Sequence, residues 1–237
     1  MVVGIGVGAF TNAGITSVSI PASVVYIGNE AFSGCESLNS VSLSEGLRQI
    51  GEMAFYHCEA LTSCALPSTL ESLGMSTFEG DSSLQSISIP GPVGEVPVGA
   101  FSGCDSLMSV TLGEGINRIN DRAFYGASAL LSIGLPQSLS YIGEQAFSCT
   151  GLTEVLVPGS VIDIGPGAFR ACAALSQVTL CEGIAYISEY AFCDCADLDA
   201  LVIPASVYSV GGEIVTRGVT QLSVAPEKKS YTTLINK

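Results

Sequence analysis

The sequence predicts a solenoid of about ten units of 22–23 residues, with a parallel β-ladder on one face and short helical or irregular turns opposite. Three observations support this fold class: the even spacing of Phe, an aliphatic residue five positions before each Phe, and an alternating apolar segment after it. A unit this short buries too little apolar surface to fold alone, so it must be stabilised by its neighbours. The nine Phe residues are Phe10, Phe32, Phe55, Phe78, Phe101, Phe124, Phe147, Phe169 and Phe192.

The strand segment begins six residues after the Phe. A Leu stands there, and two further apolar residues alternate with polar ones, as in Leu38, Val41 and Leu43. A period of two is typical of a β-strand, and a Pro often closes the segment because it cannot donate to a ladder. Stacked at about 4.8 Å, ten such strands form a parallel sheet about 45 Å long.

The turn segment contains the Phe itself. Ala precedes eight of the nine Phe residues, and the pattern around them is Ala-Phe-x-x-Cys. The unit is too short for a long helix, so we expect a single helical turn on the side opposite the ladder. Two units lack one residue, and their Ile15 and Leu152 follow the Phe by five positions.

The full pattern is Ile-Gly-x-x-Ala-Phe-x-x-Cys-x-x-Leu-x-x-Val-x-Leu-Pro, which residues 27–43 and 142–158 show plainly. It resembles the BspA-like (Treponema-type) leucine-rich repeats over about residues 4–226. The resemblance implies an α/β-type leucine-rich repeat solenoid. It also implies a cell-surface or secreted adhesion protein of a bacterium or parasitic protist that binds host matrix or mucosal surfaces. Asp81 and Ala127 depart from the pattern, since Cys is usual there.

The chain divides into residues 1–226, a single solenoid, and residues 227–237, a C-terminal cap or tail. The solenoid contains nine Phe-containing units and a degraded tenth unit without Phe or Cys. The first unit is already in register at Ile5, and residues 1–10 lack the basic region and cleavage site of a signal peptide. We therefore expect a segment of a longer protein, or one whose leader was removed.

Composition excludes several classes of function. The formal net charge of −14, from 22 acidic and eight basic residues, argues against binding nucleic acid, which needs a basic patch. The mean hydropathy of +0.51 suggests a membrane protein, yet the longest apolar run, residues 1–10, is far shorter than the roughly 20 residues of a spanning helix. We expect an extracellular or cell-surface location, with leader and anchor outside this segment.

The cysteines have two interpretations. Six occupy the position shortly after the Phe, where neighbouring turns are expected to bring them close enough for disulfides. The preferred interpretation is a ladder of small, buried, reduced side chains, because the total is odd and the positions are alike. The six are Cys35, Cys58, Cys104, Cys149, Cys172 and Cys195.

Other apparent motifs carry little chemistry. Cys193-Asp194-Cys195 lacks converging ligands for zinc, because the single His of the chain, His57, lies about six turns away. The glycines of residues 4–9 resemble a dinucleotide-binding fingerprint, but this stretch is the Ile-Gly-x-x-Ala part of the first unit and recurs in later units. Glu-Gly pairs recur every third unit, which suggests duplication of a three-unit block rather than calcium sites. We predict no catalytic residue, no metal site and no cofactor. The pairs begin at Glu45, Glu114 and Glu182.

The outward strand positions point to a contact face. They are mostly Ser in the first six units, which indicates a solvated sheet face, and they change in the later units. The predicted contact residues are Glu154, Leu156, Gln177, Thr179 and Val202. Three tyrosines, Tyr26, Tyr141 and Tyr186, share another position and are expected on a side edge, as contacts or as packing.

These observations favour a non-catalytic adhesion or protein-interaction module. It is expected to act as a monomer and to bind a protein or glycan ligand through its solenoid face. The alternative is a structural spacer within a larger surface protein, with no ligand of its own. An enzyme is the least favoured class, since no nucleophile, base or metal constellation is present.

Overall fold

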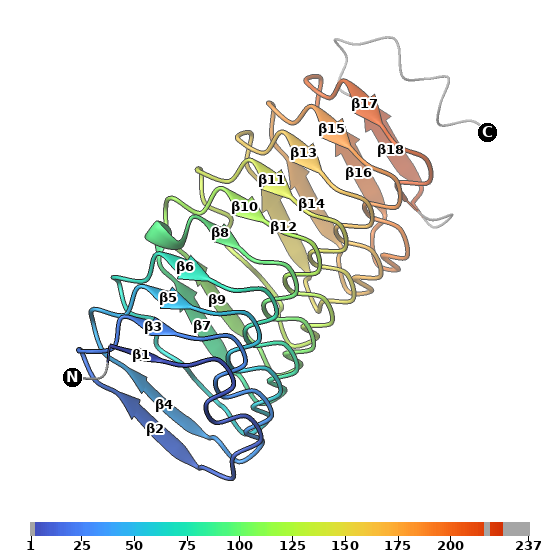
Figure 1. The fold of residues 1–237 in the computed structure, drawn as a ribbon. Coiled ribbons are helices and arrows are strands. Elements are labelled where there is room, and N and C mark those ends of the chain that lie inside the picture. Colours follow the sequence, from blue (N-terminus) through green and yellow to red (C-terminus); the bar gives the residue numbers. More distant parts are fainter. Residues whose placement is uncertain (1–2, 216–218, 225–237) are drawn as a thin grey trace.

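The computed structural model describes residues 3–215 and 219–224, which wind into an elongated solenoid with the two ends far apart (Figure 1). Each turn places equivalent residues beside one another, as the register Tyr26, Gln49, Ser72 shows. The predicted cap at residues 227–237 lies outside the described residues, as does part of the degraded tenth unit.

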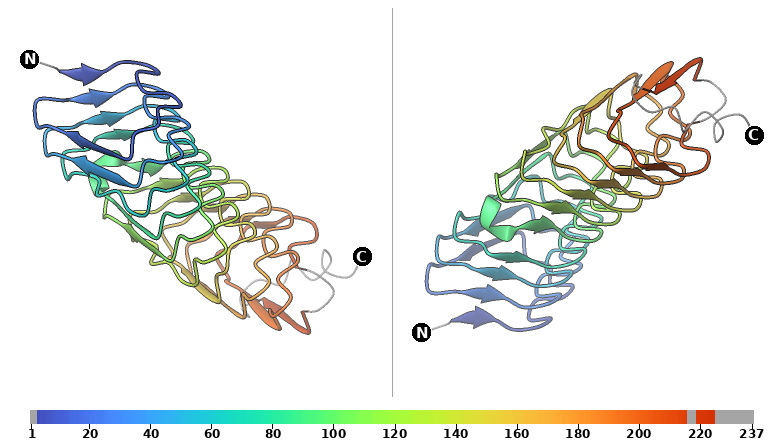
Figure 2. Two further views of the ribbon diagram at one scale, coloured as in Figure 1. Left: turned by 90° about the horizontal axis from the view of Figure 1, so that it is seen from below. Right: turned by 90° about the horizontal axis from the view of Figure 1, so that it is seen from above.

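Two ladders of parallel strands run along the solenoid, where the sequence predicted one (Figures 1 and 2). The additional ladder consists of two-residue strands whose second residue, the aliphatic residue five positions before the Phe, points into the core. Their first residues point outward and stack from turn to turn. These strands are β1 (Gly4–Ile5), β3 (Tyr26–Ile27), β5 (Gln49–Ile50), β6 (Ser72–Leu73), β8 (Glu95–Val96), β10 (Arg118–Ile119), β11 (Tyr141–Ile142), β13 (Asp163–Ile164), β15 (Tyr186–Ile187) and β17 (Ser209–Val210).

The predicted ladder is present as four-residue strands with alternating burial. It is divided into four parallel pairs, β2–β4, β7–β9, β12–β14 and β16–β18. Residues 63 and 64 make only isolated bridges to their neighbours, and residues 131–135 form no strand. The long strands are β2 (Ser17–Ile20), β4 (Ser40–Leu43), β7 (Ser86–Ile89), β9 (Ser109–Leu112), β12 (Glu154–Val157), β14 (Gln177–Leu180), β16 (Ala200–Ile203) and β18 (Gln221–Val224).

The third side of each unit consists of hydrogen-bonded turns, and the predicted helical turn is not found there. In the second unit Ala31, Ser33 and Cys35 donate to carbonyls three residues back. The intervening Glu30, Phe32 and Gly34 donate instead to the next unit. Glu30 and Gly34 have φ of 56° and 70°, so the backbone alternates in a way that cannot continue as an α-helix. The α/β description therefore does not fit the described residues, whose one helix is the 3₁₀ turn η1 (Gly91–Val93).

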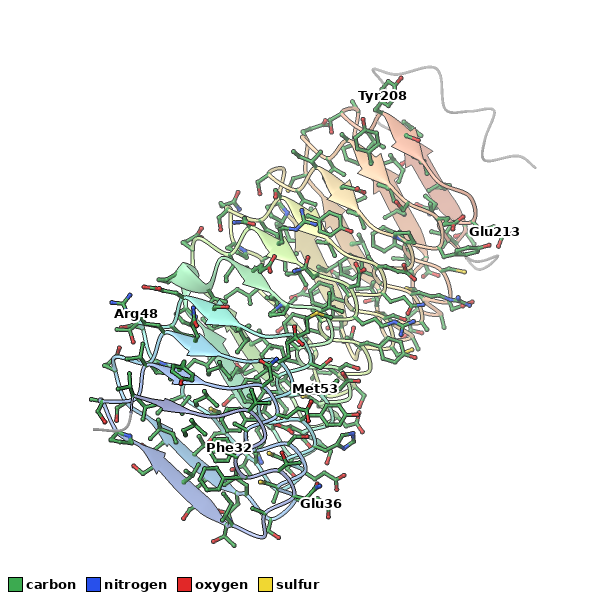
Figure 3. All side chains as sticks on the ribbon, in the orientation of Figure 1. Phe32, Glu36, Arg48, Met53, Tyr208 and Glu213 are labelled. Carbon is green, nitrogen blue, oxygen red and sulfur yellow. The ribbon has the colours of Figure 1, made fainter. Side chains whose placement is uncertain are left out.

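The core is a stack of Phe rings. Neighbouring rings lie 5.2–5.5 Å apart between centroids, with planes within 2–9° of parallel. Every Phe from Phe32, which is labelled in Figure 3, to Phe192 is fully buried, whereas Phe10 at the first turn is 42% exposed. The regular spacing of Phe in the sequence therefore corresponds to one continuous hydrophobic core in the structure.

The short-strand ladder is interrupted between β6 and β8, which separates a four-stranded from a six-stranded sheet. The Gly94 amide donates within η1, to the carbonyl of Gly91, and so is not free for the neighbouring turn. Pro97 occupies the position of a Gly such as Gly51, whose amide donates to Ile27, and a Pro has no amide proton to donate. Between β6 and β8 the solenoid therefore lacks two of the backbone hydrogen bonds that join other neighbouring turns.

Candidate functional site

The predicted contact residues lie together on the outer face of the long strands. Glu154 pairs with Gln177 and Leu156 pairs with Thr179 across β12 and β14. Val202 lies on β16, which packs beside β14. Leu156 and Val202 are 53% and 55% exposed, so this end of the face carries two uncovered apolar side chains.

The rest of the long-strand face matches the expected small polar stripe. Ser17 and Ser19 on β2 lie opposite Ser40 and Ser42 on β4, all exposed. The sequence reasoning missed two exposed apolar residues at the margin of this face, Met108 and Leu131, which occupy equivalent positions one turn apart. The repeat period identifies this surface position as the one that directly follows the strand-initiating Leu of each unit, here Leu107 and Leu130.

The tyrosines lie on a sheet face rather than on a side edge. Tyr26, Tyr141 and Tyr186 are the outward residues of β3, β11 and β15. The Arg118 guanidinium carbon lies 4.0 Å from the ring centroid of Tyr141. The Tyr186 and Tyr208 centroids are 6.1 Å apart with 71° between the rings. The sequence reasoning missed the roles of Arg118 and Tyr208, although the repeat register places both beside tyrosines.

Asp163 lies between Tyr141 and Tyr186 in the same row. Burial raises the pKa of its carboxyl group, and the charge of Arg118 offsets part of this rise. Its Oδ1 is buried without a hydrogen-bond partner. The row therefore contains a partly desolvated carboxyl group with unused hydrogen-bonding capacity between two aromatic rings.

A hollow of about 700 Å³ lies over the first part of the same ladder. The side chains of Tyr26, Gln49, Glu52, Glu95 and Asn120 line it, above a floor formed partly by glycine backbone. Several of its polar groups are already paired, since Asn120 donates to Glu95 at 3.1 Å.

The cysteine ladder differs from the prediction at one position. Five of the six predicted cysteines are buried and donate their thiol to the carbonyl of the Phe one turn earlier, at 3.0–3.2 Å; they are Cys35, Cys58, Cys104, Cys172 and Cys195. Cys149 is exposed, and Thr150 takes the buried position, 3.1 Å from the Cys172 sulfur. The residue missing from this unit therefore lies after the Cys position, not before it. All nine cysteines are free.

Two further ionisable groups singled out in the sequence, His57 and Asp194, make ion pairs. His57 is half-buried, and its Nδ1 lies 3.5 Å from a carboxylate oxygen of Glu59. Asp194 pairs with Arg170 at 3.1 Å instead of joining its cysteine neighbours. Within residues 3–215 and 219–224, no group of His, Cys, Asp and Glu could hold a metal ion. In the same residues, no helix is long and apolar enough to cross a membrane.

The Glu-Gly pairs have a structural role. Glu45 accepts hydrogen bonds from Ser68 and Thr69, and Glu182 accepts from the amides of Ala205 and Ser206 at 3.0 and 2.9 Å. The bonds from Ser68 are the main cause that lowers the pKa of Glu45. These two carboxylates thus join one turn to the next.

Comparison with known proteins identifies the repeat. The model of the BspA type leucine rich repeat region matches residues 3–130 and 94–216, in six copies. A leucine-rich repeat protein from Bacteroides ovatus ATCC 8483 has a similar structure, with 22% identity and a TM-score of 0.61 over 94% of this chain and 78% of that one. A leucine rich cell surface protein from Faecalibacterium prausnitzii A2-165 is 27% identical, with a TM-score of 0.60 over 93% of this chain and 64% of that one. No curated protein sequence matches the chain.

Proposed function

Because the chain belongs to the BspA-type leucine-rich repeat family, we propose that it is a non-catalytic module that binds a macromolecule through one face of its solenoid. Repeat solenoids present long continuous surfaces of this kind. The relative from Faecalibacterium prausnitzii is described as a cell surface protein, and we place this chain likewise at a bacterial cell surface or outside the cell. Its ligand would be a protein or glycan, such as a matrix or mucosal component of a host.

The observation that carries this proposal is the patch at Leu156 and Val202. Both side chains are more than half exposed on paired strands, where ordered backbone holds them in place at little entropic cost. Glu154 and Gln177 surround Leu156 with polar groups, as the rim of an interface does. The serines of the earlier turns supply no comparable apolar anchor.

The test is a double variant, Leu156→Glu with Val202→Glu, measured for attachment to immobilised fibronectin and mucin. Desolvating two new carboxylates opposes binding, so we expect attachment to fall at least tenfold. Ser42→Glu with Ser88→Glu is the matched control, because these exposed residues hold the equivalent strand position in earlier turns. Equal losses in both variants would contradict the patch. Periodate treatment of the mucin separates a glycan ligand from a protein ligand.

The second candidate is a structural spacer, which the serine stripe of the first turns favours. A face of small side chains offers few of the Tyr, Trp and Arg contacts that dominate binding energy. Under this alternative the unmodified protein attaches to neither surface, whatever residue stands at 156 or 202.

A further inference from the structure

The short-strand ladder carries an aromatic corner near its C-terminal end. Tyr186 projects outward from β15, and Tyr208 precedes β17 at the neighbouring turn, where Figure 3 shows it at the outer edge. The rings meet at 71° with centroids 6.1 Å apart, so they form two walls of an open angle. Tyr186 is 45% exposed and Tyr208 is 70% exposed. The corner is therefore open to a partner.

The same row contains an example of what such a ring binds. Arg118, one turn before Tyr141, places its guanidinium 4.0 Å from the ring centroid, within the range of a cation–π interaction. Tyr186 holds the same repeat position as Tyr141, two turns later. Its neighbour in the preceding turn is Asp163 instead of an arginine. The aromatic position is retained, but its cation is replaced by a carboxyl group.

Asp163 makes this neighbour significant. It places a negative charge beside the Tyr186 ring, although its Oδ1 is buried and has no hydrogen-bond partner among the described residues. A carboxylate beside an aromatic face attracts a cation twice, once by charge and once by helping to orient the guanidinium over the ring.

We propose that Tyr186, Tyr208 and Asp163 bind an arginine side chain of a basic segment in a partner protein. The planar guanidinium stacks on Tyr186 against the wall formed by Tyr208, and the negative charge of the neighbouring Asp163 carboxylate attracts it. The net charge of −14 favours approach of such a segment to this protein. The site lies on a different ladder from the Leu156 and Val202 patch, so it stands independently of the proposed function.

The experiment measures binding of a labelled peptide, four repeats of Gly-Ser-Arg, by fluorescence anisotropy at about 0.15 M salt, where long-range attraction is screened. We expect Tyr186→Ala with Tyr208→Ala, and separately Asp163→Asn, to weaken binding about tenfold, the upper range for cation–π and charge-assisted contacts. Tyr186→Phe keeps the ring and should retain binding within about twofold. The peptide with citrulline in place of arginine should bind at least tenfold more weakly.

Two controls separate this site from general charge attraction. Tyr26→Ala removes a tyrosine of the same repeat position and similar exposure, whose row neighbours are Gly4 and Gln49. Glu213→Gln removes one negative charge elsewhere, at the place labelled in Figure 3. Both should bind like the unmodified protein.

Three results would overturn the proposal: equal weakening by Tyr26→Ala, equal weakening by Glu213→Gln, or unchanged binding in the Tyr186 and Tyr208 variant with native circular dichroism. Binding of a neutral oligosaccharide at these residues, with no binding of the arginine peptide, would also overturn it. The variant Leu156→Glu with Val202→Glu should keep peptide binding, so a failure of the proposed function is distinguishable from a failure here.

Discussion

At the residue scale, the position three after the Phe shows how one buried site accepts different chemistry. Cys fills it in five turns and donates to the Phe carbonyl of the turn before. Burial raises the pKa of the Cys58 and Cys104 thiols, which keeps them protonated as donors. Thr150 and Ala127 fit the same buried space. Asp81 is the exception that brings a titratable acid into it.

Asp81 is fully buried, and its environment favours the neutral acid. Oδ1 accepts from the Cys58 amide at 2.7 Å, while Oδ2 has no partner. Burial raises the pKa of this carboxyl well above its ordinary value, the bond from Cys58 lowers it in part, and the charge of Glu59 raises it. The folded protein therefore holds a proton at Asp81 that the unfolded chain releases above pH about 4.

The first prediction concerns the pH dependence of stability. Because the pKa of Asp81 is higher in the folded state, protonated Asp81 contributes to the free energy of unfolding, and this contribution is fully present below pH about 4. It is lost as the pH rises toward the folded pKa, at up to about 1.4 kcal/mol per pH unit. Asp81→Cys should remove this decline and raise the free energy of unfolding at pH 7 by about 1–3 kcal/mol. Urea unfolding at pH 5 and pH 8 measures both effects. Asp105→Ser, at an exposed acid, is the control, and an unchanged slope in Asp81→Cys would contradict protonation of the buried acid.

Cys149 shows the limit of sequence register at this scale. A one-residue deletion can be placed before or after the Cys position, and the spacing alone does not choose. In the structure Thr150 donates to the Phe147 carbonyl and occupies the core, while Cys149 takes a left-handed position with φ of 60°. Gln145 and Cys149, four residues apart, both have positive φ, and this backbone pattern decides which side chain turns inward.

At the element scale, the turn segment and the Phe stack explain each other. Alternate amides donate along the solenoid axis, so each turn is held by its neighbour as well as by its own backbone. This brings successive Phe rings into near-parallel contact at 5.2–5.5 Å between centroids. A helical turn would direct its amides within the unit and leave the axial bonds unmade.

The second prediction follows from the stack. Phe101→Ala removes a fully buried ring that stacks on Phe78 and Phe124, so the free energy of unfolding should fall by about 3–5 kcal/mol. Phe10→Ala should cost less than half of that, because Phe10 is 42% exposed and stacks on Phe32 alone among the described rings. Urea unfolding of both variants measures the difference. If both variants lost similar free energy of unfolding, the position of a ring within the stack would not determine how much it stabilises the fold.

At the scale of the whole molecule, acidity is spread along the solenoid with few compensating cations. Arg48 pairs with Glu71 and Arg170 pairs with Asp194, both at exposed sites. Acidic residues recur one turn apart, as at Glu36 and Glu59. Like charges one turn apart repel each other and so oppose folding.

The third prediction is that salt stabilises the fold. Raising sodium chloride from about 0.01 M to about 1 M shortens the screening length from about 30 Å to about 3 Å, so repulsion among the carboxylates weakens. The free energy of unfolding at pH 7 should rise by about 1 kcal/mol or more, as measured by urea titration. At pH 4, where many carboxylates are neutral, the same salt should have a smaller effect. A decrease with salt would indicate that the exposed ion pairs outweigh the repulsion.

The sequence by itself determined the period, the Phe core, the predicted strand ladder and the outward position of Leu156 and Val202. These follow from burial, which repeats with the residue pattern, because each unit must cover the same apolar side of the next. The tertiary structure decided what depends on hydrogen bonds between turns: the second ladder, the alternating turns in place of a helix, and the interruption at Gly94 and Pro97. It also decided which unlike residues meet across turns, and so placed Asp163 beside Tyr186 and buried Asp81. These features depend on hydrogen bonds and side-chain contacts between neighbouring units, and the residue pattern within a single unit does not contain them.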